Sequence, residues 1–240
     1  MSSLKYHRVL LKLSGEVLAG ESGGGIDFSV AERICAEVVS CVRAGAELAL
    51  VVGGGNFWRG RTGGRMDAVR ADQMGMLATV MNAIALADTL EQLGVGTLVQ
   101  CSLFLPQVVS PISKPAALAA LAEGKVVLFG GGTGNPFFTT DSTAALRAAE
   151  IEADVVLKAT NVDGVYDKDP RRYPSAVKFD VLTHDDILTR RLRVMDSTAA
   201  SLCRDNGIPM LVFNLSDPSH ISRAIRGESV GTLITDAPAS

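Results

Sequence analysis

A few charged side chains stand beside glycine-rich turns, where they could handle phosphate groups. Lys12 interrupts an apolar run just before Ser14-Gly15, and Arg59 and Arg61 follow the triple glycine that begins at Gly53. A lysine in an apolar segment is costly unless its ammonium meets an anion, and arginine forks match phosphate oxygens. These residues therefore predict a site for a phosphate-bearing ligand.

Three glycine-rich turns accompany these cations. Lys12-Leu-Ser-Gly15, Gly53-Gly-Gly-Asn56 and the stretch 130–135 each close an apolar run that reads as a strand. One such turn would mean little, because tight turns after strands often need glycine. Three on one edge of a parallel sheet would gather many bare backbone amides, which bind anions. Neither the Walker loop nor the Rossmann fingerprint fits, since Trp58 and Phe137 occupy the place of the third Rossmann glycine.

The elements that must position these turns alternate between strand and helix patterns. Strands are predicted over 8–13, 47–52, 96–101, 125–129, 154–158, 209–213 and, at an edge of the sheet, 232–234. Helices are predicted over 29–44, 72–93, 115–123, 140–150, 198–205 and 218–226, with one more after the Thr183-x-x-Asp186 cap. Such alternation predicts an α/β fold, a three-layer αβα sandwich with a mainly parallel central sheet. We expect one domain over 1–240, with an N-terminal lobe to about 150 and a C-terminal lobe from about 151.

Local signals refine this outline. Ser29-x-x-Glu32 predicts a capping box, and the stretch 161–166 has hairpin chemistry before a polar loop over 167–174. Asp72 and Asp141 each open a helix, where a carboxylate is favoured as an N-terminal charge. The helical spacing of apolar residues predicts a core-facing stripe made of Met74, Leu77, Met81 and Ile84.

Composition excludes several classes of protein. The 240 residues carry 23 basic and 26 acidic side chains, a net charge of −3, and 47% are hydrophobic. This argues against a disordered chain and against direct nucleic-acid binding through a basic surface. No apolar run approaches the ~20 residues of a membrane helix. The four cysteines form no Cys-x-x-Cys pair and the three histidines lie far apart, so we expect buried thiols, no metal held by protein ligands and a cytoplasmic protein.

The chain resembles the bacterial uridylate kinases (UMP kinases) of the amino-acid kinase superfamily from about residue 8 to 234. The first two glycine turns are shared by the wider superfamily, whereas 72–82 and 133–141 are more specific to UMP kinases. The segments that carry the resemblance are Lys12–Glu16, Gly53–Asn56, Asp72–Asn82, Thr133–Asp141, Glu150–Thr160, Val162–Gly164 and Gly231–Ile234.

The resemblance implies transfer of phosphate from ATP to UMP, giving ADP and UDP for pyrimidine nucleotide biosynthesis, with Mg²⁺. It implies catalytic roles for Lys12, Arg59 and Asp141. The implied ATP-binding residues are Lys12, Leu13, Ser14, Gly15, Gly55, Arg59, Thr160, Asn161, Tyr166 and Asp169. The implied UMP-binding residues are Gly54, Asp72, Thr133, Gly134, Asn135, Pro136, Phe137, Phe138, Thr139 and Thr140.

The resemblance also implies a homohexamer with GTP as activator and UTP as feedback inhibitor. The segment associated with GTP activation is Gly20, Glu21, Ser22, Gly23, Gly24 and Gly25. A subunit interface near the stripe of Met74 is implied as well, and the sequence alone does not separate interface from core there.

The implied reaction suits these residue types. The second pKa of a phosphomonoester is near ~6, so UMP is mostly a dianion at neutral pH and needs no general base. The enzyme must align two anions and neutralise their charge. We therefore expect Asp141 to orient Lys12 or another cation, Lys158 to serve as a second cation, and Mg²⁺ to be held mainly by phosphate oxygens and water.

Two other functions stay open at this point. An acyl-phosphate-forming kinase, such as an acetylglutamate or aspartate kinase, shares the first two glycine turns but would bind a carboxylate where 133–141 lies. A nucleotide-binding regulator without catalysis is the other alternative, and the joint presence of Lys12, Arg59 and Asp141 argues against it.

Overall fold

One large sheet forms the centre of the molecule in the computed structural model, which describes residues 4–59, 66–192 and 194–236. Arg61 lies outside these residues. The sheet has the strand order β4-β3-β5-β2-β1-β6-β10-β11-β9 and is parallel except for the pairing of β10 with β11. Its strands are β1 (Arg8–Leu13), β2 (Glu47–Val52), β3 (Thr97–Cys101), β4 (Ser110–Pro111), β5 (Val126–Gly130), β6 (Val155–Thr160), β9 (Val181–Leu182), β10 (Met210–Asn214) and β11 (Gly231–Ile234).

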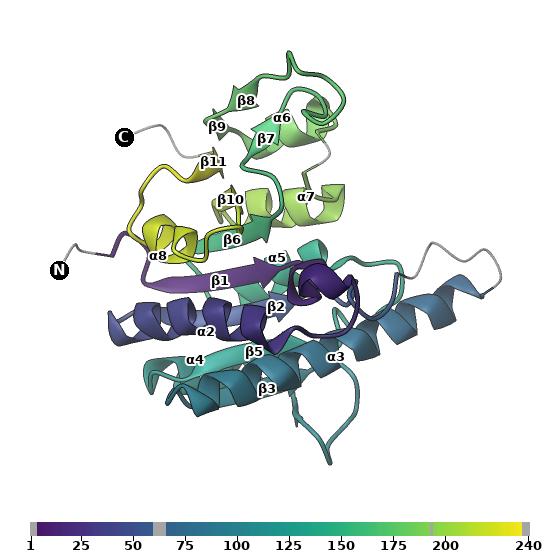
Figure 1. Cartoon of the computed structure of the whole chain (residues 1–240), viewed down its shortest axis with the longest axis vertical. Coiled ribbons are helices and arrows are strands. Elements are labelled where there is room, and N and C mark those ends of the chain that lie inside the picture. Colours follow the sequence, from purple (N-terminus) through teal and green to yellow (C-terminus); the bar gives the residue numbers. More distant parts are fainter. Residues whose placement is uncertain (1–3, 60–65, 193, 237–240) are drawn as a thin grey trace.

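Helices cover both faces of this sheet (Figure 1). One core cluster joins α2, α3 and α8 to one face, and a second joins α4, α5, α6 and α7 to the other. The predicted three-layer sandwich with a mainly parallel sheet is therefore confirmed. The helices are α1 (Gly15–Leu18), α2 (Phe28–Arg43), α3 (Ala68–Gln92), α4 (Lys114–Ala122), α5 (Thr140–Glu150), α6 (His184–Thr189), α7 (Ser197–Asp205) and α8 (His220–Ile225), and a 3-10 turn spans Gly20–Ser22.

Strand parity decides which residues face which layer. In β1, Val9, Leu11 and Leu13 pack toward α2 and α8, whereas Leu10 packs toward α5. Successive side chains of a strand alternate between faces, so Lys12 shares the face of Leu10. By the same rule Lys158 in β6 shares the face of Val156. The parallel register pairs Lys12 directly with Lys158.

The strand order changes direction between the neighbouring strands β1 and β6. From β1 the chain continues to β2 on one side, and from β6 the adjoining strand is β10 on the other. Open α/β sheets bind ligands beyond the carboxyl ends of the strands at such a switch point. Lys12 and Lys158 stand near the carboxyl ends of these two strands.

Several predicted boundaries shift for local reasons. Asp27, rather than a Ser29–Glu32 box, caps α2 by accepting hydrogen bonds from Ser29 and Val30. Asp67 caps α3, so this helix begins four residues before Asp72. The capping box formed by Thr183 and Asp186 at α6 is confirmed.

Two predicted strand features are wrong in part. β11 is not an edge strand, because β9 pairs with its outer side. The stretch 161–166 does not close a tight hairpin, since β7 (Val165–Tyr166) pairs antiparallel with β8 (Lys178–Phe179) across the loop 167–177. The predicted polar loop over 167–174 forms part of that connection.

The predicted core stripe of α3 is also wrong. Met74, Leu77, Met81 and Ile84 are 38–50% exposed, and other apolar residues of the same helix face the sheet. Those residues include Val80, Ala83, Leu86 and Leu90. Helix α3 has apolar residues on more than one face, so periodicity alone selects the wrong one.

The four cysteines are buried, as expected for small apolar side chains. Burial raises the pKa of the Cys35, Cys41 and Cys203 thiols to about 12. Among the described residues, no helix is long and apolar enough to cross a membrane.

Candidate functional site

Two lysines, one buried and one partly buried, form the charged centre of the site together with one aspartate. The Lys12 Nζ lies 2.9 Å from Oδ1 of Asp141, and the Lys158 Nζ pairs with Oδ2 of the same carboxylate. Lys158 is only 6% exposed and lies on a central strand of the sheet. The Lys158 ammonium also donates to the backbone carbonyl of Val194. Two adjacent cations are thus held together by one anion.

The electrostatics of the trio follow from burial and proximity. Burial alone would raise the pKa of Asp141, but the ammonium groups of Lys12 and Lys158 lower it below its ordinary value. Burial lowers the pKa of Lys158, while the Asp141 carboxylate opposes that shift. A carboxylate with both oxygens paired and a lowered pKa is a poor proton acceptor. The expectation that Asp141 orients cations is therefore consistent with this geometry.

The start of α5 fixes the position of Asp141. The Thr139 side chain caps this helix by accepting from the amides of Asp141 and Ser142. Asp196, which caps α7, accepts hydrogen bonds from the hydroxyls of Thr139 and Ser142. Nothing in the sequence pattern pointed to Asp196, because it is 57 and 54 residues away from the two hydroxyls that it holds.

The first two glycine turns touch each other. A Cβ on Gly15 would lie 2.2 Å from the carbonyl oxygen of Gly53. The Asn82 amide of α3 donates to that same oxygen at 2.7 Å and exchanges hydrogen bonds with the Asn56 amide. Asn56 also donates to the Gly25 carbonyl at 2.8 Å. The predicted effector loop, 20–25, is therefore tied to the glycine turn after β2.

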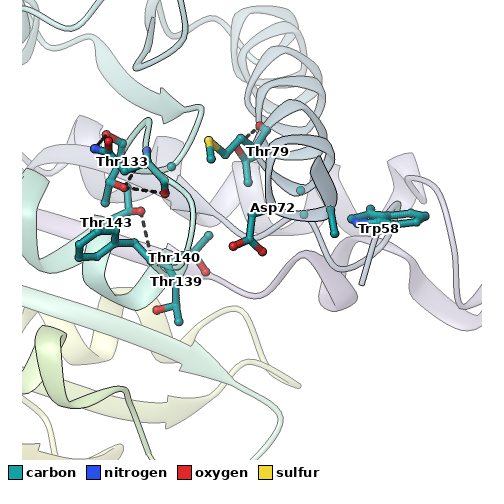
Figure 2. Close-up of a pocket in the computed structure, with 14 residues that line it drawn as sticks. Trp58, Asp72, Thr79, Thr133, Thr139, Thr140 and Thr143 are labelled. Atoms are coloured by element: carbon teal, nitrogen blue, oxygen red, sulfur yellow. Dashed lines mark hydrogen bonds between the residues drawn. The ribbon is translucent and has the colours of Figure 1, made fainter. Parts of the chain in front are cut away.

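A smaller pocket of about 130 Å³ opens beside this turn, between α3 and the start of α5 (Figure 2). Figure 2 shows Asp72 pointing from α3 toward the wall that carries Thr139 and Thr140. Of the residues predicted to bind UMP, this pocket is lined by Gly54, Asp72, Thr133, Asn135, Phe138, Thr139 and Thr140. Gly134, Pro136 and Phe137 belong to the same loop but do not line the pocket.

Asp72 also holds that loop. Its Oδ2 accepts the backbone N–H of Phe137 at 2.7 Å. Phe137 has a φ of 71°, a left-handed conformation that a bulky residue adopts only when its surroundings impose it. The Asp72 carboxylate thus links α3 to the segment 133–138 across the pocket.

A second, larger cavity of about 730 Å³ opens onto the lysine pair. It is lined by Lys12, Ser14 and Lys158, and by four further residues predicted to bind ATP, namely Thr160, Asn161, Tyr166 and Asp169. Leu13 is fully buried in the core, so only its backbone could meet a ligand. Gly15, Gly55 and Arg59 do not line this cavity. Arg59 pairs with Glu16 of α1 at 3.1 Å.

Several residues that line the two cavities were not predicted from the sequence. In the smaller pocket these are Trp58, Ala71, Gly75, Met76, Thr79, Gly132 and Thr143. Helical spacing could have found some of them, because Asp72, Met76 and Thr79 share one face of α3. In the larger cavity, five missed residues are the cations Lys168, Arg171, Arg172, Arg190 and Arg191. They come from two loops that only the fold brings together.

Comparisons with known proteins match this chain to one family and to solved UMP kinases. The model of the amino acid kinase family matches residues 7–214. The solved UMP kinase of Bacillus anthracis is 38% identical, with 97% of each chain covered and a TM-score of 0.93. That of Ureaplasma parvum is 36% identical, covers 97% of this chain and 100% of its own, and has a TM-score of 0.91. The uridylate kinase of Archaeoglobus fulgidus is 32% identical, with 95% and 99% covered and a TM-score of 0.73.

Proposed function

This chain belongs to the amino acid kinase family, and on that premise we propose that it is a UMP kinase, a phosphotransferase that converts ATP and UMP to ADP and UDP. The observation that carries the proposal is the lysine pair, which lines the larger cavity and is held by Asp141, the residue after Thr140 in the wall of the smaller pocket. The chain also matches solved UMP kinases over nearly its whole length. The larger cavity would take ATP, and the smaller pocket would take UMP. The product would serve pyrimidine nucleotide biosynthesis.

The chemistry requires alignment and charge neutralisation. The UMP phosphate is already mostly a dianion at neutral pH, so its oxygen can attack the γ-phosphate without a general base. Lys12 and Lys158 would stabilise the charge on the transferring phosphoryl group, because ammonium groups held in place cost no reorganisation during the reaction. Asp141 would hold both in position. We propose Arg59, which follows the Gly53–Asn56 turn and pairs with Glu16, as a third cation.

Mg²⁺ fits this site only as a companion of the nucleotide. Both oxygens of Asp141 are engaged by lysines, and the described residues contain no group of three carboxylate, histidine or cysteine side chains placed to hold a metal ion. Phosphate oxygens and water would therefore be its ligands. When bound, Mg²⁺ would neutralise part of the charge of the triphosphate.

The assembly and control implied by the resemblance remain proposals. The exposed apolar face of α3 supports self-association, and we propose a cytoplasmic homohexamer of single-domain subunits with an N-terminal UMP-binding lobe and a C-terminal ATP-binding lobe. The contact between Gly25 and Asn56 supports GTP activation through the loop 20–25. UTP is proposed as the feedback inhibitor.

An ADP-release assay tests the function. The purified protein, supplied with ATP and Mg²⁺, is expected to turn over UMP but neither acetylglutamate nor aspartate, and CMP is assayed beside them. Turnover of an amino acid without turnover of UMP would show an acyl-phosphate-forming kinase instead. Tight binding of ATP and UMP with no UDP formed would show a regulator. The same assay with GTP or UTP added measures the proposed control.

Substitution of Asp72 tests the acceptor pocket. Asp72→Ala removes the acceptor for the Phe137 amide and a carboxylate that lines the pocket, so we expect KM for UMP to rise by about 10- to 100-fold. KM for ATP should stay within about twofold. Asp67→Ala is the matched control, because Asp67 only caps the same helix. Equal changes in both KM values would argue against a UMP site at Asp72.

A further inference from the structure

A buried arginine lies close to the smaller pocket, although it lines neither cavity and is not among the predicted site residues. Arg147, on α5, is 4% exposed. Its Nη1 pairs with Glu150, its Nη2 donates to the Ser102 hydroxyl at 3.2 Å, and its guanidinium lies 5.8 Å from the centre of the Phe129 ring. An arginine so deeply buried is costly unless it is paired.

Ser102 carries the contact of Arg147 to the pocket wall. Its hydroxyl donates to the Gly132 carbonyl at 2.8 Å, and Gly132 lines the smaller pocket. The Ser102 amide also donates to the Gly130 carbonyl at 3.2 Å. Two consecutive hydrogen bonds thus connect the Arg147 guanidinium to the glycine turn, defined here as Gly130–Gly134.

The glycine turn needs this support because its own backbone is unusual. Gly131, Gly132 and Gly134 all have positive φ. These three residues are therefore not part of a helix or strand whose regular backbone hydrogen bonds could stabilise the turn. On the other side, the Gly131 amide donates to the Thr79 hydroxyl of α3 at 2.9 Å. The turn is therefore held from two sides, by Thr79 and by Ser102.

The face of α5 that bears Arg147 forms another wall of the same pocket. Thr139, Thr143 and Arg147 are spaced by four residues and share one side of the helix. Thr139 and Thr143 line the pocket, and a Cβ built on Gly132 would lie 3.7 Å from the Thr143 hydroxyl. Arg147 stands one turn deeper and joins α5 to the glycine turn.

We propose that Arg147 and Ser102 are positioning residues for the acceptor nucleotide, because they fix the glycine turn against α5 at the width that this ligand needs. The inference rests on the proposed function for the identity of the ligand, UMP. It predicts an effect on the acceptor alone, since neither residue lines the larger cavity.

Ser102→Ala and Arg147→Lys test the relay. The alanine removes the hydroxyl between Arg147 and Gly132, and the lysine lacks the fork that reaches Glu150 and Ser102 together. Each variant is expected to raise KM for UMP, and the Kd for UMP measured by calorimetry, about tenfold, as for the loss of one charged hydrogen bond. The kcat and KM for ATP should stay within about twofold. In the double variant, KM for UMP should rise no further than in the more impaired of the two single variants, because both changes break the same connection.

Arg8→Lys is the matched control. Arg8 makes a similar fork, to Glu47 and to the Ile151 carbonyl, at the amino end of β1 and away from both cavities. It should lower Tm without changing KM for UMP. The proposed relay would be overturned if the single variants left KM and Kd for UMP unchanged. It would also be overturned if they altered kcat and both KM values together as Tm falls. A wild-type protein that neither binds nor phosphorylates UMP would instead overturn the proposed function.

Discussion

Asp141→Asn is expected to lower kcat by a factor of about 10² to 10³, the size of effect seen when a preorganised charge-stabilising group is lost. The carboxylate holds Lys12 and Lys158 side by side, although the register of β1 and β6 places these two cations directly opposite each other. A neutral amide cannot offset their repulsion, so the ammonium groups should move apart. Steady-state kinetics with both substrates would measure the loss.

The pH profile of the same variant should also move. Burial lowers the pKa of Lys158, and the Asp141 carboxylate opposes this shift by favouring the charged ammonium. Without that anion the pKa of Lys158 falls further, so its charge is lost at a lower pH. The alkaline limb of kcat should therefore shift to lower pH in Asp141→Asn.

Asp154→Asn is a suitable control for this experiment. Asp154 accepts the amides of His7 and Arg8 at the amino end of the sheet, far from the paired lysines along the strands. We expect it to change stability but to leave kcat within about twofold. A kcat loss of only twofold in Asp141→Asn would remove the orienting role of Asp141.

Gly15→Ala should reduce kcat/KM for both substrates by about 100-fold or more, because a misplacement near 1 Å at a reacting site can cost that much. The added Cβ would lie 2.2 Å from the Gly53 oxygen and 2.7 Å from the Asn56 side-chain oxygen. The first of these is backbone, so the two glycine turns must separate. Overpacking of this kind also lowers the free energy of unfolding by about 1–3 kcal/mol.

Gly96→Ala is the matched control for this change. A Cβ at Gly96 would meet only the flexible side chain of Lys125, at 3.3 Å, beside the amino end of β3. Activity should be retained there. If Gly15→Ala keeps kcat/KM within threefold of the wild type, the contact between the two turns does not position the nucleotides.

Local pattern was enough to predict much of this molecule. The alternation of strand and helix signals predicted the three layers, and the glycine turns were correctly placed at strand ends. Lys12 stood out because a cation interrupted an apolar strand. These features depend on neighbours within a few residues, and backbone periodicity and turn chemistry act over that range. The motifs of 72–82 and 133–141 indicated the family to which the chain is similar.

Contacts between distant segments required the tertiary structure. Sequence alone did not show that Lys12 faces Lys158, since this needs both the strand order and the register of β1 against β6. Which apolar face of α3 is buried also depended on what packs against it, and the predicted stripe proved to be exposed.

The charged side chains first noted in the sequence show this division. Their type and their place beside glycine turns determined that the protein handles phosphate groups, because few other ligands suit buried cations and bare amides. Only the fold decided that one aspartate from α5 holds Lys12 together with Lys158, and that Ser102 joins Arg147 to a wall of the smaller pocket. Side-chain chemistry is local to a residue, whereas its partners are set by how strands and helices far apart in the chain pack together.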